Sequence, residues 1–306
     1  MPTRTPPRDV TAPLRPAYAR AMLDRAGVDD PAVERAFAAV AREEFLLAPP
    51  WAVYTGTTIE HTGDPVALYR DVLVALAPDR GVNNGSPSLH AGWIAALGVR
   101  PGERIVHIGA GTGYYTAILA LLAGPEGRVT AVEIDPDLTA VARRALPAAL
   151  PDGPPVEVIA GDGGQWPQSE ADVIYVSYGI AAPSPPWLDR LADGGRLLFP
   201  LCTPRGALSA TRHWQGAEGV GILVERTGCG FAARSLDRCS FVYGDAAAVP
   251  SLDRALLDQA FRRGGWGRVR SLVRGAAADP TRCWYAGSDW GLCYDPPAPR
   301  VAGDGA

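Results

Sequence analysis

Residues 104–120 read RIVHIGAGTGYYTAILA, and this stretch decides the fold that the sequence predicts. It opens with an apolar run typical of a buried strand and closes with a run typical of a helix. Gly109, Gly111 and Gly113 stand between the two. Glycines at such a junction let the main chain approach a ligand closely. The dinucleotide fingerprint G-x-G-x-x-G would need a glycine where Tyr114 stands, which disfavours NAD.

Around this stretch, helical and strand-like segments alternate from Ser88 to about residue 201. Ser88 is the expected cap of the first helix. The predicted helices are 88–97, 114–123, 137–148 and 187–192, and the predicted strands are 104–108, 128–134, 156–160, 171–177 and 196–200. Because parallel strands need crossover connections, this alternation predicts an α/β fold with a mostly parallel, doubly wound sheet.

The rest of the chain divides into an N-terminal and a C-terminal part. The first dozen residues have the composition of a loose tail, and Asp30 and Pro31 begin a helix. From Ala48 to about Pro87 we expect a Pro- and Gly-rich loop with one short strand at 72–76. After residue 205 we expect strands at 221–225 and 240–243 and a helix at 252–262. The predicted parts are therefore 1–87, 88–205 and 206–306.

Composition limits the class of protein. The chain has 306 residues, is 47% apolar and carries a net charge of −4, so it can bury a large core and does not favour nucleic acid. No run approaches the ~18 uncharged apolar residues of a membrane span, and the start lacks the apolar centre of a secretory signal. We therefore expect a cytoplasmic protein with no membrane partner.

The basic residues and the cysteines argue against lysine-based catalysis, a disulfide framework and a zinc site. All 29 basic residues are arginines, so no lysine can form a Schiff base or clamp a phosphate. The five cysteines are scattered and lack C-x-x-C spacing, which predicts neither a disulfide framework nor a zinc site. Reduced, mostly buried thiols are the expectation.

Acidic residues follow two of the predicted strands. Glu133 ends the second core strand, about 20 residues beyond the glycines, where a carboxylate can accept hydrogen bonds from both hydroxyls of a ribose. Asp162 follows the third core strand and can meet an adenine edge. Each signal alone is weak, since an acid after a strand is often only a helix cap. Together with the glycine turn, they predict a nucleoside cofactor.

These motifs resemble the class I S-adenosylmethionine-dependent methyltransferases and, within them, the protein-L-isoaspartate O-methyltransferase family. The resemblance extends over about residues 31–243. It is carried by VERA at 33–36, VAREEFL at 40–46, YRD at 69–71, VHIGAGTGYY at 106–115, VTAVEID at 129–135, GDG at 161–163 and DGGRLLFP at 193–200. The resemblance implies a Rossmann-like fold with an N-terminal helical cap, a cofactor-binding core and a C-terminal α+β extension.

The resemblance also implies the cofactor, S-adenosyl-L-methionine, with S-adenosyl-L-homocysteine as its product. Glu133 would hold the ribose, Asp162 and Gly163 the adenine, and the glycine turn the methionine part. The implied cofactor-binding residues are Gly109, Ala110, Gly111, Gly113, Tyr114, Glu133, Ile134, Asp162 and Gly163. Where the family has an acidic residue two places before the first glycine, this chain has His107, which could simply pack at the strand end.

The substrate loop departs further from the family. The family's G-Q-T-I-S-Q-P aligns without gaps to residues 81–87, so its active serine falls on Gly85. Ser86 stands one position later. Either the loop slips to present Ser86, or the methyl acceptor has changed.

A carboxylate acceptor is already ionised near neutral pH and needs no general base. The candidates for orienting it are Ser86 and Ser88, with Asn83 and Asn84 as donors to the substrate. Ordinary turn chemistry is the alternative for this cluster. A further candidate is His90, which could act as a general base toward a hydroxyl or amine, or be a helix-surface histidine. Aromatic residues near the fourth core strand, Tyr178 among them, could shape an acceptor wall or only pack.

The sequence thus predicts a methyltransferase that forms a carboxyl O-methyl ester on an aspartate or isoaspartate of a peptide or protein. Peptide tailoring is favoured over general repair. The alternatives are methylation of a small-molecule hydroxyl, nitrogen or carbon, a cofactor-binding scaffold without catalysis and, most weakly, an NAD oxidoreductase.

The C-terminal extension carries a basic patch around Trp266. Its arginines are Arg262, Arg263, Arg268, Arg270 and Arg274. Such a patch could bind an acidic peptide or nucleic acid, although a solvated basic face is commoner. The extension could cover the active site, recognise a leader or substrate, or build a dimer.

Overall fold

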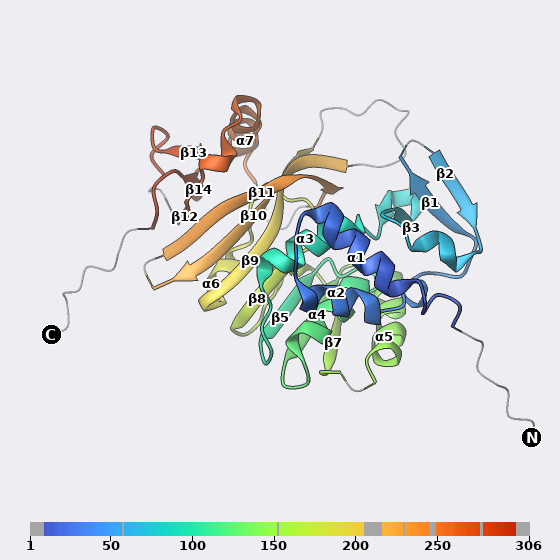
Figure 1. Ribbon diagram of the computed structural model, residues 1–306. Coiled ribbons are helices and arrows are strands. Elements are labelled where there is room, and N and C mark those ends of the chain that lie inside the picture. The colour runs from blue at the N-terminus through green and yellow to red at the C-terminus, as the bar shows by residue number, and fades with distance from the viewer. Residues whose placement is uncertain are drawn as a thin grey trace, which may run out of the picture.

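The glycine-bearing stretch lies within a ten-stranded sheet of order β13-β14-β12-β11-β10-β9-β8-β5-β6-β7 (Figure 1). The computed structural model describes residues 9–297 except 57, 152, 205–215, 229, 245–248 and 276–277. The first core strands are β5 (Arg104–Ile108), β6 (Arg128–Glu133), β7 (Val156–Ala160) and β8 (Ala171–Val176). The later strands are β9 (Leu191–Pro204), β10 (Gly216–Thr227), β11 (Gly230–Val242), β12 (Ser271–Arg274), β13 (Cys283–Ala286) and β14 (Trp290–Cys293).

The predicted doubly wound sheet is confirmed. β5 pairs in parallel with β6 on one side and with β8 on the other, and β9 continues the parallel set. From β9 to β14 the pairing is antiparallel. Strand order therefore reverses at β5, and ligands of open α/β sheets bind outside the carboxyl ends of the strands at this point.

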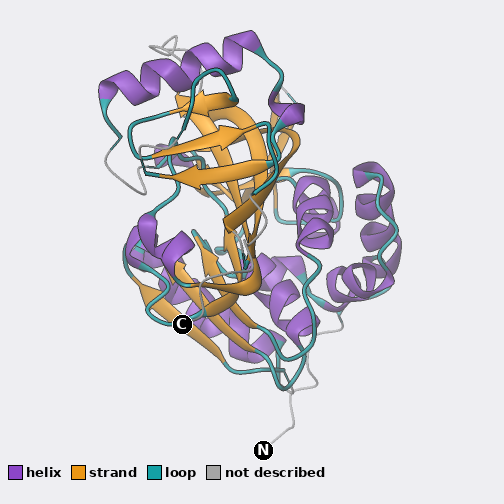
Figure 2. Ribbon diagram, turned by 90° about the vertical axis from the view of Figure 1, so that its left-hand side faces the viewer, coloured by secondary structure: helices purple, strands orange, loops and turns teal. Residues whose placement is uncertain are grey.

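Helices cover both faces of the sheet, as Figure 2 shows. Successive residues of the strands point to opposite faces: Ile105 and Tyr175 join one buried cluster with the N-terminal helices, and Val106 and Ile174 join the other. The helices are α1 (Arg15–Ala26), α2 (Pro31–Ala39), α3 (Pro87–Leu97), α4 (Tyr114–Ala123), α5 (Pro136–Ala149), α6 (Pro185–Asp189) and α7 (Ser251–Arg263).

Local chemistry explains where these helices begin. Asp30 and Asp135 accept main-chain N–H bonds at the starts of α2 and α5, as N-caps do. The expected Ser88 cap is wrong, because Ser86 caps α3 and Pro87 takes its first position. The helix predicted at 187–192 is also misplaced, since α6 ends at Asp189 and Leu191 already belongs to β9.

The N-terminal part differs most from the prediction. Helix α1 was not expected, although Tyr18, Ala19, Met22 and Leu23 recur at helical spacing and are buried. The predicted 48–87 loop contains a four-stranded sheet of order β2-β1-β3-β4. Its strands are β1 (Trp51–Thr55), β2 (Thr58–Thr62), β3 (Leu73–Ala77) and β4 (Val82–Asn83). Only β3 had been predicted, because β2 is almost wholly exposed and shows no apolar alternation.

The C-terminal part extends one edge of the main sheet through β12, β14 and β13. α7 and the strands β12 to β14 confirm an α+β extension. The expectation of reduced thiols is wrong for one pair, since Cys283 and Cys293 form a disulfide between β13 and β14. Cys202 and Cys239 are free and buried, and Cys229 lies outside the described residues. No helix of the described ranges has both the length and the apolar character to cross a bilayer.

Candidate functional site

The glycine turn follows β5 and leads into α4. Gly109, Gly111 and Gly113 have φ values of 71°, 57° and 94°, a left-handed region that favours glycine. A Cβ on Gly109 would lie 2.7 Å from the Tyr178 ring. In front of Gly111 only Leu76 comes close, at 3.6 Å from such a Cβ. The turn therefore leaves its main chain open at the middle glycine.

Glu133 meets this turn from the end of β6. One carboxylate oxygen accepts the N–H of Gly111 at 2.7 Å, and the other accepts the N–H of Asp135 at 3.0 Å. Burial raises the pKa of Glu133 above its ordinary value, while these two hydrogen bonds act in the opposite direction. The neighbouring Ile134 is 72% exposed, an unusual state for an isoleucine. A carboxylate and an uncovered apolar side chain thus flank the glycine turn.

The loop after β7 packs tightly beside this acid. Asp162 accepts the N–H of Gly164 at 2.8 Å and begins a short 3-10 helix. A Cβ on Gly163 would lie 2.2 Å from Ile108, so only glycine lets this loop approach β5. Tyr178 lies across the same region, since its hydroxyl is 3.6 Å from that Cβ position.

A cavity of about 980 Å³ opens beside the glycine turn. It runs between the end of α1, the loop before α3, α3 itself and β11. The predicted residues that line it are Asn83, Asn84, Ser86, Ser88, His90, Gly109, Ala110, Gly111 and Tyr114. Those that do not line it are Gly113, Glu133, Ile134, Asp162, Gly163 and Tyr178. The structure therefore brings the predicted catalytic residues and the glycine turn to one cavity.

Both serines of the loop are held by Asp71. Ser86 and Ser88 donate their hydroxyls to its two carboxylate oxygens at 3.0 and 2.6 Å, and the Ser88 N–H donates at 3.1 Å. Arg25 approaches the same carboxylate at 3.5 Å. Asp71 belongs to the YRD motif at 69–71, but nothing in the sequence alone marks it as a site residue.

The two asparagines also hold the loop itself. Asn83 accepts the N–H of Gly85 at 2.9 Å, and Asn84 accepts the N–H of Val74 at 2.8 Å. The buried guanidinium of Arg42 contacts Asn84 at 3.3 Å. The same guanidinium donates to the carbonyls of Leu68, Arg70 and Val72. The Asn83 contact is ordinary turn chemistry, whereas the Asn84 contacts join the loop to β3 and to Arg42.

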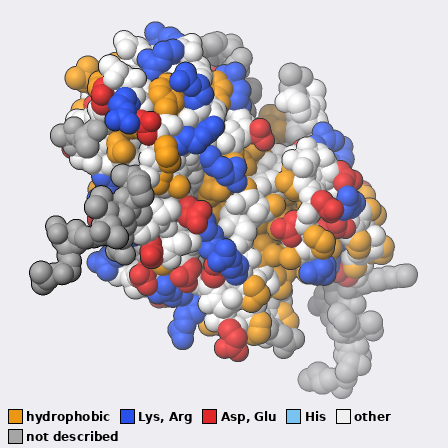
Figure 3. Space-filling model, turned by 60° about the vertical axis from the view of Figure 1, so that its left-hand side comes forward, with side chains coloured by type: hydrophobic (Ala, Val, Ile, Leu, Met, Phe, Trp, Pro, Cys, Tyr) orange, Lys and Arg blue, Asp and Glu red, His pale blue; other side chains and the backbone are white. Residues whose placement is uncertain are grey.

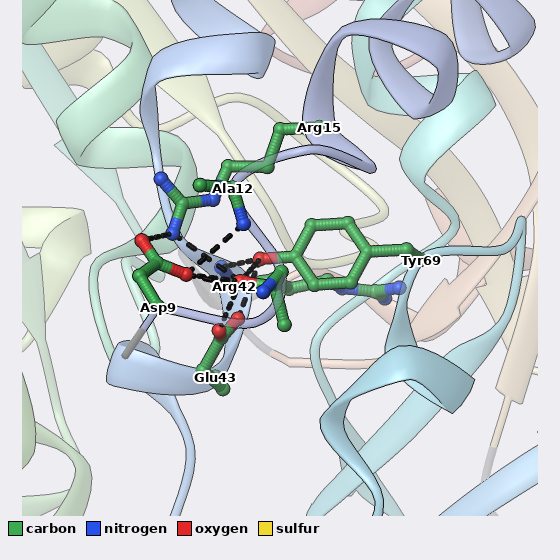
Figure 4. A network of polar contacts seen from close by, with 7 residues as sticks. Asp9, Ala12, Arg15, Arg42, Glu43 and Tyr69 are labelled. Atoms are coloured by element: carbon green, nitrogen blue, oxygen red, sulfur yellow. Dashed lines mark hydrogen bonds and ion pairs between the residues drawn. The ribbon is translucent and has the colours of Figure 1, made fainter. Parts of the chain in front are cut away.

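A second polar network fixes the main chain at Arg42 (Figure 4). The Tyr69 hydroxyl accepts the Arg42 N–H at 3.1 Å and donates to Glu43 at 2.5 Å. Thr11 also donates to Glu43, at 2.6 Å, and Asp9 pairs with Arg15 beside it. This network ties the N-terminal segment to the element that supports the substrate loop.

His90 lies beneath the loop rather than on a helix surface. Its Nδ1 contacts the Tyr175 hydroxyl at 2.6 Å, and its ring stacks on Tyr115 with 3.7 Å between centroids. A Cβ on Gly85 would lie 2.3 Å from His90 Nε2, so the imidazole fills the space of a residue-85 side chain. Burial lowers the pKa of His90 well below 6.5.

His107 packs at the end of β5, as one reading of the sequence expected. Its nitrogens contact Thr116 at 2.8 Å and Ser177 at 2.9 Å, and its ring stacks on Tyr175. Burial lowers its pKa to about 3. Both imidazoles at the cavity are therefore neutral near pH 7, and Tyr114 points its ring into the core against Phe37 and Phe45.

The reversal of strand order at β5 and the glycine turn at its carboxyl end define a Rossmann-like α/β protein. A family model described as protein-L-isoaspartate(D-aspartate) O-methyltransferase matches residues 20–220. The chain belongs to this family. The match ends within β10, so β11 and the C-terminal extension lie beyond it.

Several relatives carry the same description. A protein-L-isoaspartate O-methyltransferase of Aeropyrum pernix is 38% identical over 126 residues, which are 40% of this chain and 48% of that protein. One of Methylorubrum populi is 34% identical over 182 residues, covering 59% of this chain and 76% of that protein. The chain thus spans about half the length of the Aeropyrum relative.

Solved structures support the fold. A protein-L-isoaspartate O-methyltransferase structure aligns with a TM-score of 0.59 at 20% identity, covering 92% of this chain and 88% of its own. A Plasmodium falciparum chain with this description, in complex with S-adenosyl-L-homocysteine, aligns with a TM-score of 0.57 at 19% identity. That alignment covers 75% of this chain and 97% of the other. The predicted fold class is confirmed.

Proposed function

We propose that this protein is an S-adenosyl-L-methionine-dependent methyltransferase that forms methyl esters on aspartate or isoaspartate carboxylates of a peptide or protein. The observation that carries the proposal is the contact of Glu133 with the Gly111 N–H, beside a cavity that contains the substrate loop. Family membership supports the same activity. A cytoplasmic location stays a prediction from the sequence.

The residues present fit the cofactor. An ionised carboxylate has about four lone-pair sites, so Glu133 can keep its two main-chain hydrogen bonds and still accept ribose hydroxyls. Ile134 offers an uncovered apolar surface for a flat base. Asp162 would meet the edge of that base. The open main chain at Gly111 would receive the amino-acid part. When bound, the cofactor supplies a methyl group activated by a sulfonium.

The two neutral histidines favour a carboxylate as the acceptor. An imidazole with a strongly lowered pKa is a poor base, so His90 is badly suited to take a proton from a hydroxyl or an amine. A carboxylate is already ionised near neutral pH and needs no such step. The protein has then only to align the acceptor and exclude water. Burial of His90 and the packing of Tyr115 against it serve that exclusion.

Two measurements test the proposal. Label from radioactive cofactor transferred to an isoaspartyl peptide should be released as methanol by mild alkali, whereas alkali-stable label would contradict ester formation. Calorimetry with S-adenosyl-L-homocysteine should show at least about tenfold weaker binding for Glu133→Gln, because hydrogen bonds to a charged group contribute about 1.5–3 kcal/mol. Glu157→Gln, an exposed glutamate on β7, is the matched control.

A further inference from the structure

The strand β11 has one open edge. On its other edge it pairs with β10 along its length, from Gly230 to Val242. On the open side, β12 pairs only with Phe231 and Ala232, and the N–H of Ala233 donates to Arg270. At the far end, Val242 accepts the N–H of Gly179 at 2.8 Å. Among the described residues, no strand pairs with 234–241 on this side.

This open stretch borders the cavity that holds the substrate loop. Its lining includes Arg234 and every residue from 236 to 242. Because successive side chains of a strand point to opposite faces, a cavity lined by consecutive residues reaches the edge of the strand as well as a face. The open edge and the glycine turn therefore share one space.

The direction of the main-chain groups follows from the contact at Val242. The N–H and C=O of alternate residues point to the same edge of a strand. Since Val242 directs its carbonyl to Gly179, Ser240 and Arg238 direct their main-chain groups to the same open edge. Beyond them a bulge places Leu236 and Asp237 opposite Gly221. Bulges are common beside active sites and deter uncontrolled pairing at an edge.

The Val242 end of this edge lies next to the predicted reaction centre. Gly179 follows Ser177, which contacts His107, and Tyr178, which packs against Gly109. A strand laid along β11 would therefore begin near the glycine turn and run outward past Ser240 and Arg238.

The outward part of the edge carries positive charge. Arg234 and Arg238 are exposed and form no ion pair with a described residue, and Asp237 is the one carboxylate between them. The Arg238 guanidinium lies 5.4 Å from the centre of the Trp266 ring. Trp266 belongs to the C-terminal extension, so the extension positions this arginine. Figure 3 shows several arginine side chains, and fewer acidic ones, over the upper lobe of the molecule.

The other acids of the cavity are already engaged. Asp30 accepts two main-chain N–H groups as the cap of α2, and Asp29 pairs with Arg20 at 3.4 Å. The positive charge at the outer end of the edge is therefore left for a ligand.

We infer that the methyl acceptor is an extended peptide that docks as an added strand on the open edge of β11, an inference that rests on the proposed function. Its main chain pairs with Arg238 and Ser240, and acidic side chains beyond the acceptor residue meet Arg238 and Arg234. Strand addition gives affinity through the main chain and specificity through alternate side chains. The docking assigns a role to the extension, which orients Arg238 through Trp266.

Three synthetic peptides test the docking on the full-length protein. Each has about eight residues, roughly 26 Å when extended at ~3.3 Å per residue, with a central isoaspartate. The first has glutamates beyond the acceptor, the second has glutamines there, and the third repeats the first with alternate main-chain amides N-methylated. Fluorescence anisotropy measures binding with S-adenosyl-L-homocysteine present. We expect the second and third peptides to bind about tenfold more weakly than the first.

Protein variants separate charge from strand pairing. Arg234→Ala and Arg238→Ala should each weaken binding of the glutamate peptide about fivefold. Binding of the glutamine peptide should change by no more than about twofold. Arg144→Ala, an exposed arginine on α5 outside the cavity, should change neither. The N-methylated peptide is compared with the first peptide on the unaltered protein. This comparison therefore does not depend on whether a variant folds.

The docking and the proposed function fail differently. Equal binding of the first and third peptides, or no binding of any peptide, overturns the docking even if methyl transfer occurs. Binding in the expected order without transfer of label to any peptide leaves the docking standing and contradicts the proposed methylation.

Discussion

At the scale of single residues, two buried imidazoles distinguish this cavity. His90 and His107 lie at 2% and 1% exposure, and burial lowers the pKa of both. Each is paired with hydroxyls rather than with a carboxylate: Tyr175 for His90, and Thr116 and Ser177 for His107. The folded protein thus keeps both rings neutral at a pH where an unfolded chain would begin to protonate them.

This difference predicts a loss of stability in acid. Below pH 6.5 the unfolded chain binds a proton at His107, whereas the folded chain does not until about pH 3. The free energy of unfolding therefore decreases as the pH is lowered. From pH 7 to pH 5 the loss from this residue is about 2 kcal/mol. Urea unfolding at pH 7 and pH 5 should show a clearly smaller decrease in the free energy of unfolding for His107→Gln than for the unaltered protein. An unchanged drop would contradict the neutral buried ring, and His61→Gln, exposed on β2, is the control.

Part of this site could be predicted from the sequence. The approach of Glu133 to the glycine turn could be predicted, because the ends of neighbouring parallel strands meet at one edge. The engagement of Ser86 and Ser88 by Asp71 could not, since it depends on how the segment after Tyr69 folds back on α3. For the same reason, the contacts of Asn84 with Val74 and Arg42 could not be predicted, and both asparagines were expected to donate to a substrate.

At the scale of elements, the start of α3 is fixed from outside the helix. Asp71 accepts the hydroxyls of Ser86 and Ser88 and one main-chain N–H of the first turn, so it acts as a cap supplied by another segment. The loop before α3 is additionally held by Arg42 through Asn84. These contacts give the substrate loop one conformation beside the glycine turn.

Removing this cap should destabilise the protein. Asp71→Ala leaves two hydroxyls and an N–H without their acceptor, and we expect a loss of about 1–3 kcal/mol in the free energy of unfolding. The urea midpoint measures it. Asp79→Ala, whose carboxylate is exposed, should stay within about 0.5 kcal/mol of the unaltered protein. A similar value for Asp71→Ala would show that the cap is dispensable.

Elements with a strong period were predictable, and the others were not. β5, α4 and β7 lie at the predicted residues because their apolar runs end at glycines or polar residues. β10 and β11 extend well beyond the predicted 221–225 and 240–243, because glycines and polar residues, such as Arg234 and Arg238 in β11, interrupt their apolar pattern. The small N-terminal sheet was missed because its pairing is between segments of weak pattern.

At the scale of the whole molecule, the C-terminal extension shares the core of the main sheet. Leu257 of α7, Leu272 of β12 and Trp284 of β13 belong to the same buried cluster as Phe199 and Ile222 of the main sheet. The extension is therefore part of the folding unit, although the family match ends at residue 220. Elements that share one buried cluster are expected to unfold together.

This shared core gives the last prediction. Trp284 is fully buried, donates its indole N–H to Gly264 at 3.0 Å and packs edge-on against Phe261. Trp284→Ala should cost about 3–5 kcal/mol, as large-to-small core substitutions do, and should move one cooperative transition seen by both circular dichroism and fluorescence. Trp266→Ala, which removes a partly exposed ring, should cost clearly less. An early transition limited to part of the signal would instead mean that the extension melts alone, and Arg238 would then lose its support before the main sheet unfolds.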